Sequence, residues 1–301
     1  MITLQDVIDI HVHAGPELFQ RVGDAAELAQ AASAEGMGGI VLKSHSEPTT
    51  TAAYYVGQMV PSIQVWGGLV LNEFVGGINP SSVAAAIQGG ARIIWGPTLH
   101  ARHHIEQLGP RMFGTGHMTL TDSLTSSGVA WTEDGRLTPE ALSVVALASE
   151  ADVTIATGHA AMAETRSLAE ACVGAGTRCL ITHGFFLGQD VDFLAAMCGI
   201  GAMIEISASL SFPFEHYIFR NHGGGMRLEK VLELVDRIGA DRVVVSSDCG
   251  QLHNASPAEG LRSFLYGLKA VGVSEDDIDT MTRKTPRVVL GISDPCRNAA
   301  G

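Results

Sequence analysis

Eight short apolar runs recur along this chain of 301 residues, and most are followed by a segment with helical periodicity. They lie at 7–13, 39–45, 63–71, 92–98, 153–159, 179–183, 202–207 and 243–248. Continuous apolar runs are typical of parallel strands buried on both faces. Eight strand–helix units in a chain of this length predict an α/β fold, a single (β/α)8 TIM barrel. A doubly wound sheet is the alternative, but no Gly-x-Gly-x-x-Gly turn follows the first run and no Walker A sequence occurs.

Helical segments are expected at 24–35, 51–59 and 80–88, and another begins with Thr138 as N-cap and Pro139 at the first helical position. Residues 99–137, rich in Gly, His, Ser and Thr, interrupt this alternation. The interruption is too long for a plain connector and predicts a functional loop or lid. Because no linker or shift in composition marks a boundary, we expect residues 1–301 to form a single domain.

The formal net charge of −13, without any Lys/Arg cluster, argues against a nucleic-acid partner. No apolar run reaches the ~18–20 residues that a bilayer span requires, so we expect no membrane partner. The chain begins without a basic region followed by an apolar one, and its five cysteines form no Cys-x-x-Cys pair. Reduced thiols and a cytoplasmic location are therefore expected.

The first run ends in His11-Val12-His13. Side chains alternate along a strand, so both imidazoles project to the same side. Neutral imidazole suits zinc, iron and nickel, which makes the pair half of a metal site. Two polar residues at the mouth of a strand are the alternative for an isolated His-x-His.

Polar residues also end four later runs: Lys43 and His45, His159, His183, and Asp248. Taken singly, each histidine has an ordinary explanation as a hydrogen-bonded loop residue, and the aspartate as a cap. Together they fall where the carboxyl ends of barrel strands converge on one face, which is where barrel active sites lie. The pattern predicts a metal centre at that face.

At this point a family resemblance appears. HVHAG at the first run, GH at the fifth, TH at the sixth and SSD at the eighth resemble the amidohydrolase superfamily of metal-dependent barrels. The segment 281–291 (MTRKTPRVVLG) is similar to the helix that often closes those chains. LKSH together with SDCGQ and PAEGLRSF is typical of an uncharacterised branch. The resemblance covers nearly the whole chain and implies an enzyme that acts on a small molecule.

The resemblance implies that His11, His13 and Asp248 bind a first divalent metal. His159 and His183 would bind a second, or would help to ligate the first in one-metal members. Zn²⁺ is the expected ion, with Mn²⁺, Fe²⁺ and Ni²⁺ as alternatives.

One departure concerns the fourth run, where the superfamily usually bridges two metals with a carboxylated lysine or a glutamate. Here the run ends Trp95-Gly96-Pro97-Thr98. Lys43 is the nearest substitute: as a carbamate it could bridge two cations, and as an ammonium it would bind a substrate carboxylate. One and two metals per chain both remain open.

The implied reaction is hydrolysis of an amide, cyclic amide, lactone or related ester by a metal-activated water. Asp248 would be the general base, with His183 and Lys43 as further catalytic groups. The candidates for substrate contacts are His45, His100, His104, His216 and Arg220.

Two other functions compete with this one. A decarboxylase or hydratase with one metal would use the same ligands, and a non-catalytic metal-binding barrel is a third possibility. Apolar helices on a barrel exterior make a homo-oligomer plausible.

Overall fold

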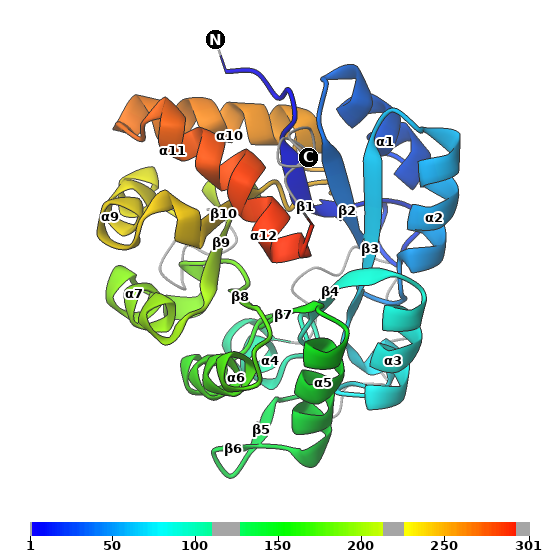
Figure 1. Ribbon diagram of the computed structural model, residues 1–301, viewed down its shortest axis with the longest axis vertical. Coiled ribbons are helices and arrows are strands. Elements are labelled where there is room, and N and C mark those ends of the chain that lie inside the picture. Colours follow the sequence, from blue (N-terminus) through cyan, green and yellow to red (C-terminus); the bar gives the residue numbers. More distant parts are fainter. Residues whose placement is uncertain (1, 110–126, 213–225, 293–301) are drawn as a thin grey trace, which may run out of the picture.

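Eight parallel strands form one barrel in the computed structural model, which describes residues 2–109, 127–212 and 226–292. In spatial order they are β1 (Ile8–His13), β2 (Gly39–Lys43), β3 (Gln64–Val70), β4 (Ala91–Trp95), β7 (Thr154–Ala156), β8 (Cys179–Ile181), β9 (Met203–Ser207) and β10 (Val243–Ser246). A parallel bridge between Val12 and Cys249 joins the two ends of this order. The predicted (β/α)8 barrel is confirmed (Figure 1).

Helices surround the strands as the alternating sequence predicts (Figure 1). They are α1 (Ala25–Ala34), α2 (Thr50–Met59), α3 (Pro80–Gln88), α5 (Pro139–Glu150), α6 (Met162–Gly174), α7 (Val191–Ile200), α9 (Leu228–Ile238) and α10 (Pro257–Val271). Each turns an apolar stripe to the sheet; in α9 the buried residues are Val231, Leu234 and Val235, at helical spacing. Thr138 caps α5 as expected, because its hydroxyl accepts from the Ala141 amide at 3.1 Å.

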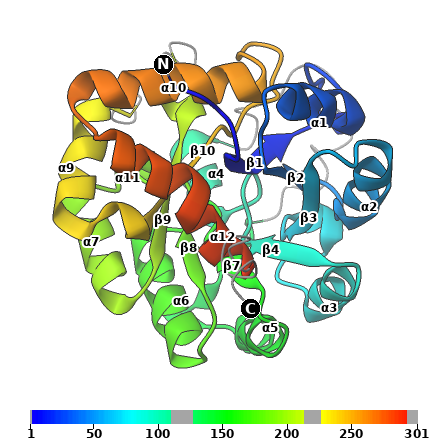
Figure 2. The same ribbon diagram turned by 45° about the horizontal axis from the view of Figure 1, so that its top comes forward.

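A second apolar cluster fills the inside of the barrel and includes Ile8, Ile10 and Trp95. Val289 and Leu290 of α12 (Thr285–Leu290) join it. Because the first residue of β7, Thr154, donates to the Val289 carbonyl, α12 closes the end of the barrel where the strands begin. Figure 2 shows α12 lying across that end, preceded by α11 (Glu275–Asp279) and the π-helical turn η6 (Thr280–Lys284).

The pairing of β1 with β2 shifts register between Asp9 and Val12. Ile8, before the shift, and Ile10, within it, belong to the interior cluster, whereas Val12, after it, packs with the outer layer of helices. His11 and His13 are thereby directed inward, and a bulge of this kind commonly re-aims a side chain beside an active site.

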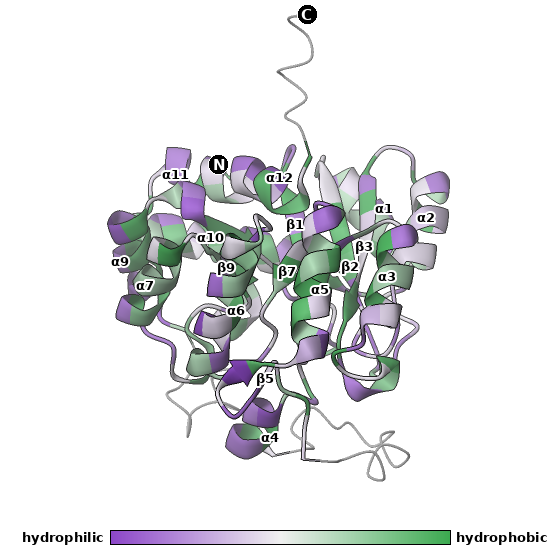
Figure 3. Cartoon of the chain, turned by 60° about the horizontal axis from the view of Figure 1, so that its bottom comes forward, coloured by the Kyte–Doolittle hydropathy of each residue, from purple (hydrophilic) through white to green (hydrophobic). Residues whose placement is uncertain are grey.

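The described parts of the long excursion lie at the opposite end of the barrel (Figure 3). They are α4 (Arg102–Leu108) and a short hairpin of β5 (Thr132–Glu133) and β6 (Arg136–Leu137). Short 3₁₀ turns η1 (Glu73–Val75), η2 (Phe186–Gly188), η3 (Ala208–Ser211) and η5 (Ala240–Arg242) complete the connections. Within the described ranges, no helix combines the length and apolar character needed to cross a membrane.

Candidate metal centre

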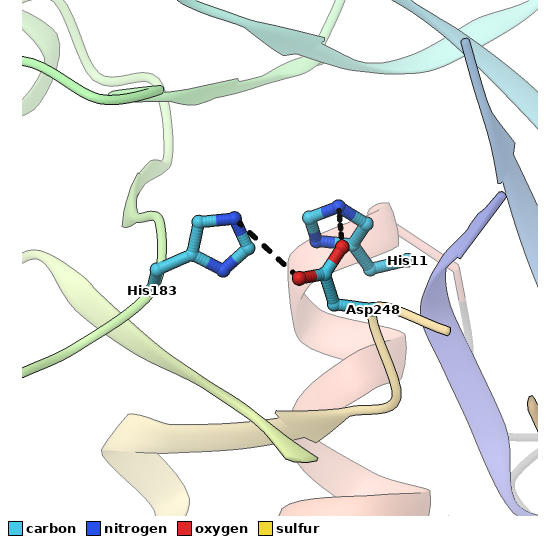
Figure 4. A group of neighbouring side chains, drawn as sticks. All are labelled: His11, His183 and Asp248. Atoms are coloured by element: carbon cyan, nitrogen blue, oxygen red, sulfur yellow. Dashed lines mark ion pairs between the residues drawn. The ribbon is translucent and has the colours of Figure 1, made fainter. Parts of the chain in front are cut away.

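Three side chains from distant parts of the sequence converge inside the barrel: His11 from β1, His183 just after β8, and Asp248 just after β10 (Figure 4). One donor atom from each lies within 4.8 Å of the other two. The carboxylate stands between the imidazoles: Oδ1 is 3.0 Å from His11 Nε2, and Oδ2 is 3.9 Å from His183 Nε2. His13 Nε2 lies 3.2 Å from the same Oδ1. These four residues were all predicted as ligands, and the structure brings them together.

His183 and Asp248 have backbone φ angles of +54° and +49°. The left-handed region is unfavourable for side chains with a Cβ, and such residues concentrate at functional sites. Both lie beyond the last ladder residue of their strands, Ile181 and Ser246, although the sequence predicted them as strand ends. The turn is what carries them over the barrel mouth. Ser209 fixes the aspartate further by donating to Oδ2 at 2.7 Å.

Glu205 of β9 is a buried member of the centre that the sequence argument missed. Its Oε1 accepts from His11 Nδ1 and from the Ser246 hydroxyl, each at 2.7 Å. Burial opposes its ionisation, but His11 and these hydrogen bonds lower the pKa of Glu205 to about 2. Its other oxygen, Oε2, is buried and has no hydrogen-bond partner within the described part of the chain.

Lys43 is buried in the same centre, with Nζ 2.9 Å from His11 Nε2 and 5.3 Å from the Trp95 ring. Burial lowers the pKa of Lys43 to about 8, against the opposing pull of Asp248 and Glu205. The ammonium of Lys43 therefore loses its proton more readily than that of an exposed lysine.

The donor set fits a divalent cation. Burial and Lys43 lower the pKa of His11, but Asp248 and Glu205 more than offset them, so the net shift is upward. Burial lowers the pKa of His183 to about 4, which keeps that imidazole neutral. Two imidazoles and a carboxylate suit zinc and related ions, and a position that attracts a proton between two carboxylates also attracts a metal.

A second group, His13, Glu17 and His45, also has donor atoms within 4.8 Å of one another. Glu17 already pairs with the buried guanidinium of Arg21, which also donates to His13 Nδ1 at 3.2 Å. Because that guanidinium already supplies a positive charge, this group suits a cation less well than the first. Glu17 and Arg21 are not predictable from the sequence, because they lie in a loop without a motif.

His159 is hydrogen-bonded to His104, the two Nδ1 atoms being 2.8 Å apart. Both rings are buried, and burial lowers the pKa of each. The Phe186 ring packs over His159 at 4.9 Å and reaches His183 at 5.8 Å. His159 therefore borders the centre through His183, whose ring centroid is 5.4 Å away.

The remaining predicted contacts are spread more widely. His45 stacks on His13 and bonds Thr98 through Nδ1 at 3.0 Å. His100 receives the Glu73 amide at 3.4 Å. His216 and Arg220 lie outside the described residues.

A family model described as "Family of unknown function (DUF6282)" matches residues 6–205. That range includes His11, His183 and Glu205 and ends before Asp248. A comparison with curated protein sequences found no significant match.

Solved structures share the fold across nearly their full length. An amidohydrolase from Pseudomonas aeruginosa is 12% identical with a TM-score of 0.63, over 95% of this chain and 97% of that one. A candidate 2-pyrone-4,6-dicarboxylic acid hydrolase from Pseudomonas putida is 16% identical, with a TM-score of 0.57 over 96% and 98%. A 2,6-dihydroxybenzoate decarboxylase from Rhizobium is 11% identical, with a TM-score of 0.55 over 96% and 99%. The likeness confirms the amidohydrolase-like barrel as a fold.

Proposed function

This chain belongs to the DUF6282 family, and we propose that it is a metal-dependent hydrolase acting on an amide, cyclic amide, lactone or related ester of a small molecule. The observation that carries the proposal is the convergence of His11, His183 and Asp248 inside an amidohydrolase-like barrel. A buried carboxylate is costly unless a positive charge lies beside it, and a metal ion held by the carboxylate and the two imidazoles would supply that charge.

His11, His183 and Asp248 would hold the ion, and His13 would join them on losing the Nε2 proton that it directs at Asp248. Zn²⁺ is the ion that we propose. When bound, a divalent ion supplies a Lewis acid that polarises a carbonyl and lowers the pKa of an attacking water. Zinc, a cytoplasmic location and a homo-oligomeric assembly all belong to the proposal.

Asp248 would take the proton from the attacking water and pass it to the leaving group. Two features suit it to this role. Ionisation is favoured, because His11, His183 and hydrogen bonds from His11 and His13 outweigh burial and hold the pKa of Asp248 well below its usual range. Ser209 also keeps one carboxylate oxygen in a fixed orientation.

Lys43 would bind a carboxylate of the substrate. As an ammonium it has three donors, and the Asp248 and Glu205 carboxylates favour that charge against burial. A small substrate with one acidic group would therefore suit this barrel mouth.

The second candidate is a decarboxylase that uses one metal. It is favoured by β4, which ends at Trp95 and is followed by Gly96-Pro97-Thr98, without a bridging lysine or glutamate. Among the fold neighbours, the Rhizobium protein is a decarboxylase of 2,6-dihydroxybenzoate. In this function Lys43 would hold the carboxylate that is lost.

The test begins with the metal content of the purified protein, followed by removal with a chelator and reloading with Zn²⁺ or Mn²⁺. Reloaded protein is then assayed against a panel of lactones, esters, amides and cyclic amides, and against hydroxylated aromatic carboxylates for CO₂ release. Metal-dependent ester, lactone or amide hydrolysis supports the proposal, and CO₂ release alone supports the second candidate. Protein that binds neither ion contradicts both.

A further inference from the structure

The two imidazoles that flank Asp248 are connected to each other through side chains of β9 and β10. His11 Nδ1 meets Glu205 Oε1 at 2.7 Å. The Ser246 hydroxyl donates to the same oxygen at 2.7 Å. Ser246 Oγ lies 3.4 Å from Ser207 Oγ, which is 2.6 Å from His183 Nδ1. Glu205, Ser246 and Ser207 are completely buried, so bulk water does not reach these contacts.

Glu205 determines which atoms donate and which accept along this row of hydrogen bonds. An ionised carboxylate only accepts, so the hydroxyl of Ser246 donates its single proton to Glu205. Ser246 Oγ can then only accept from Ser207, and a Ser207 that gives its proton to this 3.4 Å contact accepts from His183 through its own Oγ. One assignment places a proton in each contact, and it puts the proton of His183 on Nδ1. His11 is fixed in the same way, because its Nδ1 donates directly to Glu205.

We infer that Glu205 is a positioning residue that holds a proton on Nδ1 of both His11 and His183, so that Nε2 of each is the atom left to face Asp248 and to bind a metal. The inference rests on the proposed function, since a lone pair at both positions serves a metal bound there. Hydrogen-bond partners that orient a ligating histidine commonly change metal affinity by about 10–100-fold. In this barrel one carboxylate does so for two ligands, one directly and one through two serines.

His159 pairs instead with a histidine of α4. Its Nδ1 meets His104 Nδ1, and two imidazoles can share a proton in either direction. The His104–His159 pair lies outside the contacts that join Glu205 to His11 and His183.

The test uses Ser246→Ala, a small change that cuts the network between Glu205 and Ser207 but leaves the contact between Glu205 and His11. Two quantities are measured on the full chain: the Kd for Zn²⁺ by chelator competition, and the His183 tautomer from imidazole ¹⁵N shifts of metal-free protein. We expect a Kd weaker by roughly tenfold and loss of the single Nδ1–H form of His183. Thr165→Val is the matched control, because Thr165 is equally buried and its hydroxyl has no hydrogen-bond partner within the described residues.

Two further variants test the shared origin. Glu205→Leu should disturb His11 and His183 together, while Glu205→Gln, which keeps an accepting oxygen, should restore the His183 tautomer. Ser207→Ala combined with Ser246→Ala should weaken Zn²⁺ binding no more than Ser207→Ala alone, because both cut one path.

An unchanged His183 tautomer in folded Ser246→Ala, or a Zn²⁺ Kd that moves no more than in Thr165→Val, overturns the inference. If wild-type protein binds no Zn²⁺, the proposed function fails, and the tautomer of metal-free His183 still tests the network by itself.

Discussion

Four polar side chains surround the carboxylate of Asp248. Its Oδ1 faces His11 and His13, its Oδ2 faces Ser209 and His183, and its backbone lies in the left-handed region. Strain of this kind persists only where surrounding contacts over-determine a conformation. The backbone of Asp248 is therefore held in an unfavourable conformation that brings its carboxylate to these four side chains.

Replacing Asp248 by asparagine keeps the side-chain volume and removes the charge. We expect the Kd for Zn²⁺ to weaken by more than about 100-fold, the upper end of what loss of an outer partner costs, because a ligand itself is lost. Turnover of any substrate found should fall with it. Asp241→Asn is the control, since that side chain is 75% exposed. Wild-type affinity in Asp248→Asn would remove the carboxylate from the proposed ligand set.

His104 gives a pH prediction. Burial, followed by the charges of His103, His100 and His183, lowers the pKa of His104 to about 3, against an ordinary value of 6.5. The unfolded chain therefore takes up this proton first, and stability is lost as pH falls from 6.5 toward 3.

In His104→Gln this contribution disappears. The free energy of unfolding of metal-free protein should then fall less steeply with acid, by about 1.4 kcal/mol per pH unit within that window. Urea denaturation of both proteins at several pH values measures the difference. Parallel curves would show that His104 is not held neutral by the fold.

Among the elements, the strand ends decide where the side chains point. The sequence pattern correctly located all eight strands, because a strand buried on both faces requires a continuous apolar run. It did not reveal the register shift in β1 or the turn at Asp248, since both depend on pairing between distant segments.

The same distinction explains which site residues were found. His11, His13, His183 and Asp248 are recognisable because they follow apolar runs. Glu205 stands inside the run of β9, where a buried charge indicates a partner but not which one. Glu17 and Arg21 have no periodic context, so only the folded chain shows them beside His13.

The turn after β7 provides a prediction at this scale. Gly158 has φ +66°, and a Cβ there would lie 2.3 Å from the Pro97 carbonyl oxygen. Gly176 has φ +78° with open space around it. Alanine at 176 should cost only the left-handed penalty, about 1–2 kcal/mol.

Alanine at 158 should cost more, on the order of 3 kcal/mol or above, because backbone must move as well. It should also displace His159, which follows directly in the chain. Urea denaturation of the two variants compares the costs. Equal destabilisation would mean that the loops after β4 and β7 leave room for a Cβ at position 158.

At the scale of the whole molecule, one end of the barrel is closed by α12 and the other carries the candidate metal centre. Val289 and Leu290 seal the interior where the strands begin, and the polar layer lies toward the opposite end, with α4 and the β5–β6 hairpin (Figure 3). The apolar interior cluster stabilises the barrel. It can therefore hold the buried charges and the positive φ angles of His183 and Asp248 without unfolding. Metal bound only by the folded chain would add stability, by about 2.7 kcal/mol at a free concentration of 100 Kd.

Equilibrium binding of Zn²⁺ to chelator-treated protein, read as stoichiometry and as a rise in the midpoint of thermal unfolding, tests the central claim most directly. We predict at least one equivalent bound in wild-type protein, a higher midpoint, and loss of both effects in His11→Gln and in Asp248→Asn. Wild-type protein that binds no Zn²⁺ or Mn²⁺ and gains no stability from either would contradict the assignment of a metal centre to this barrel.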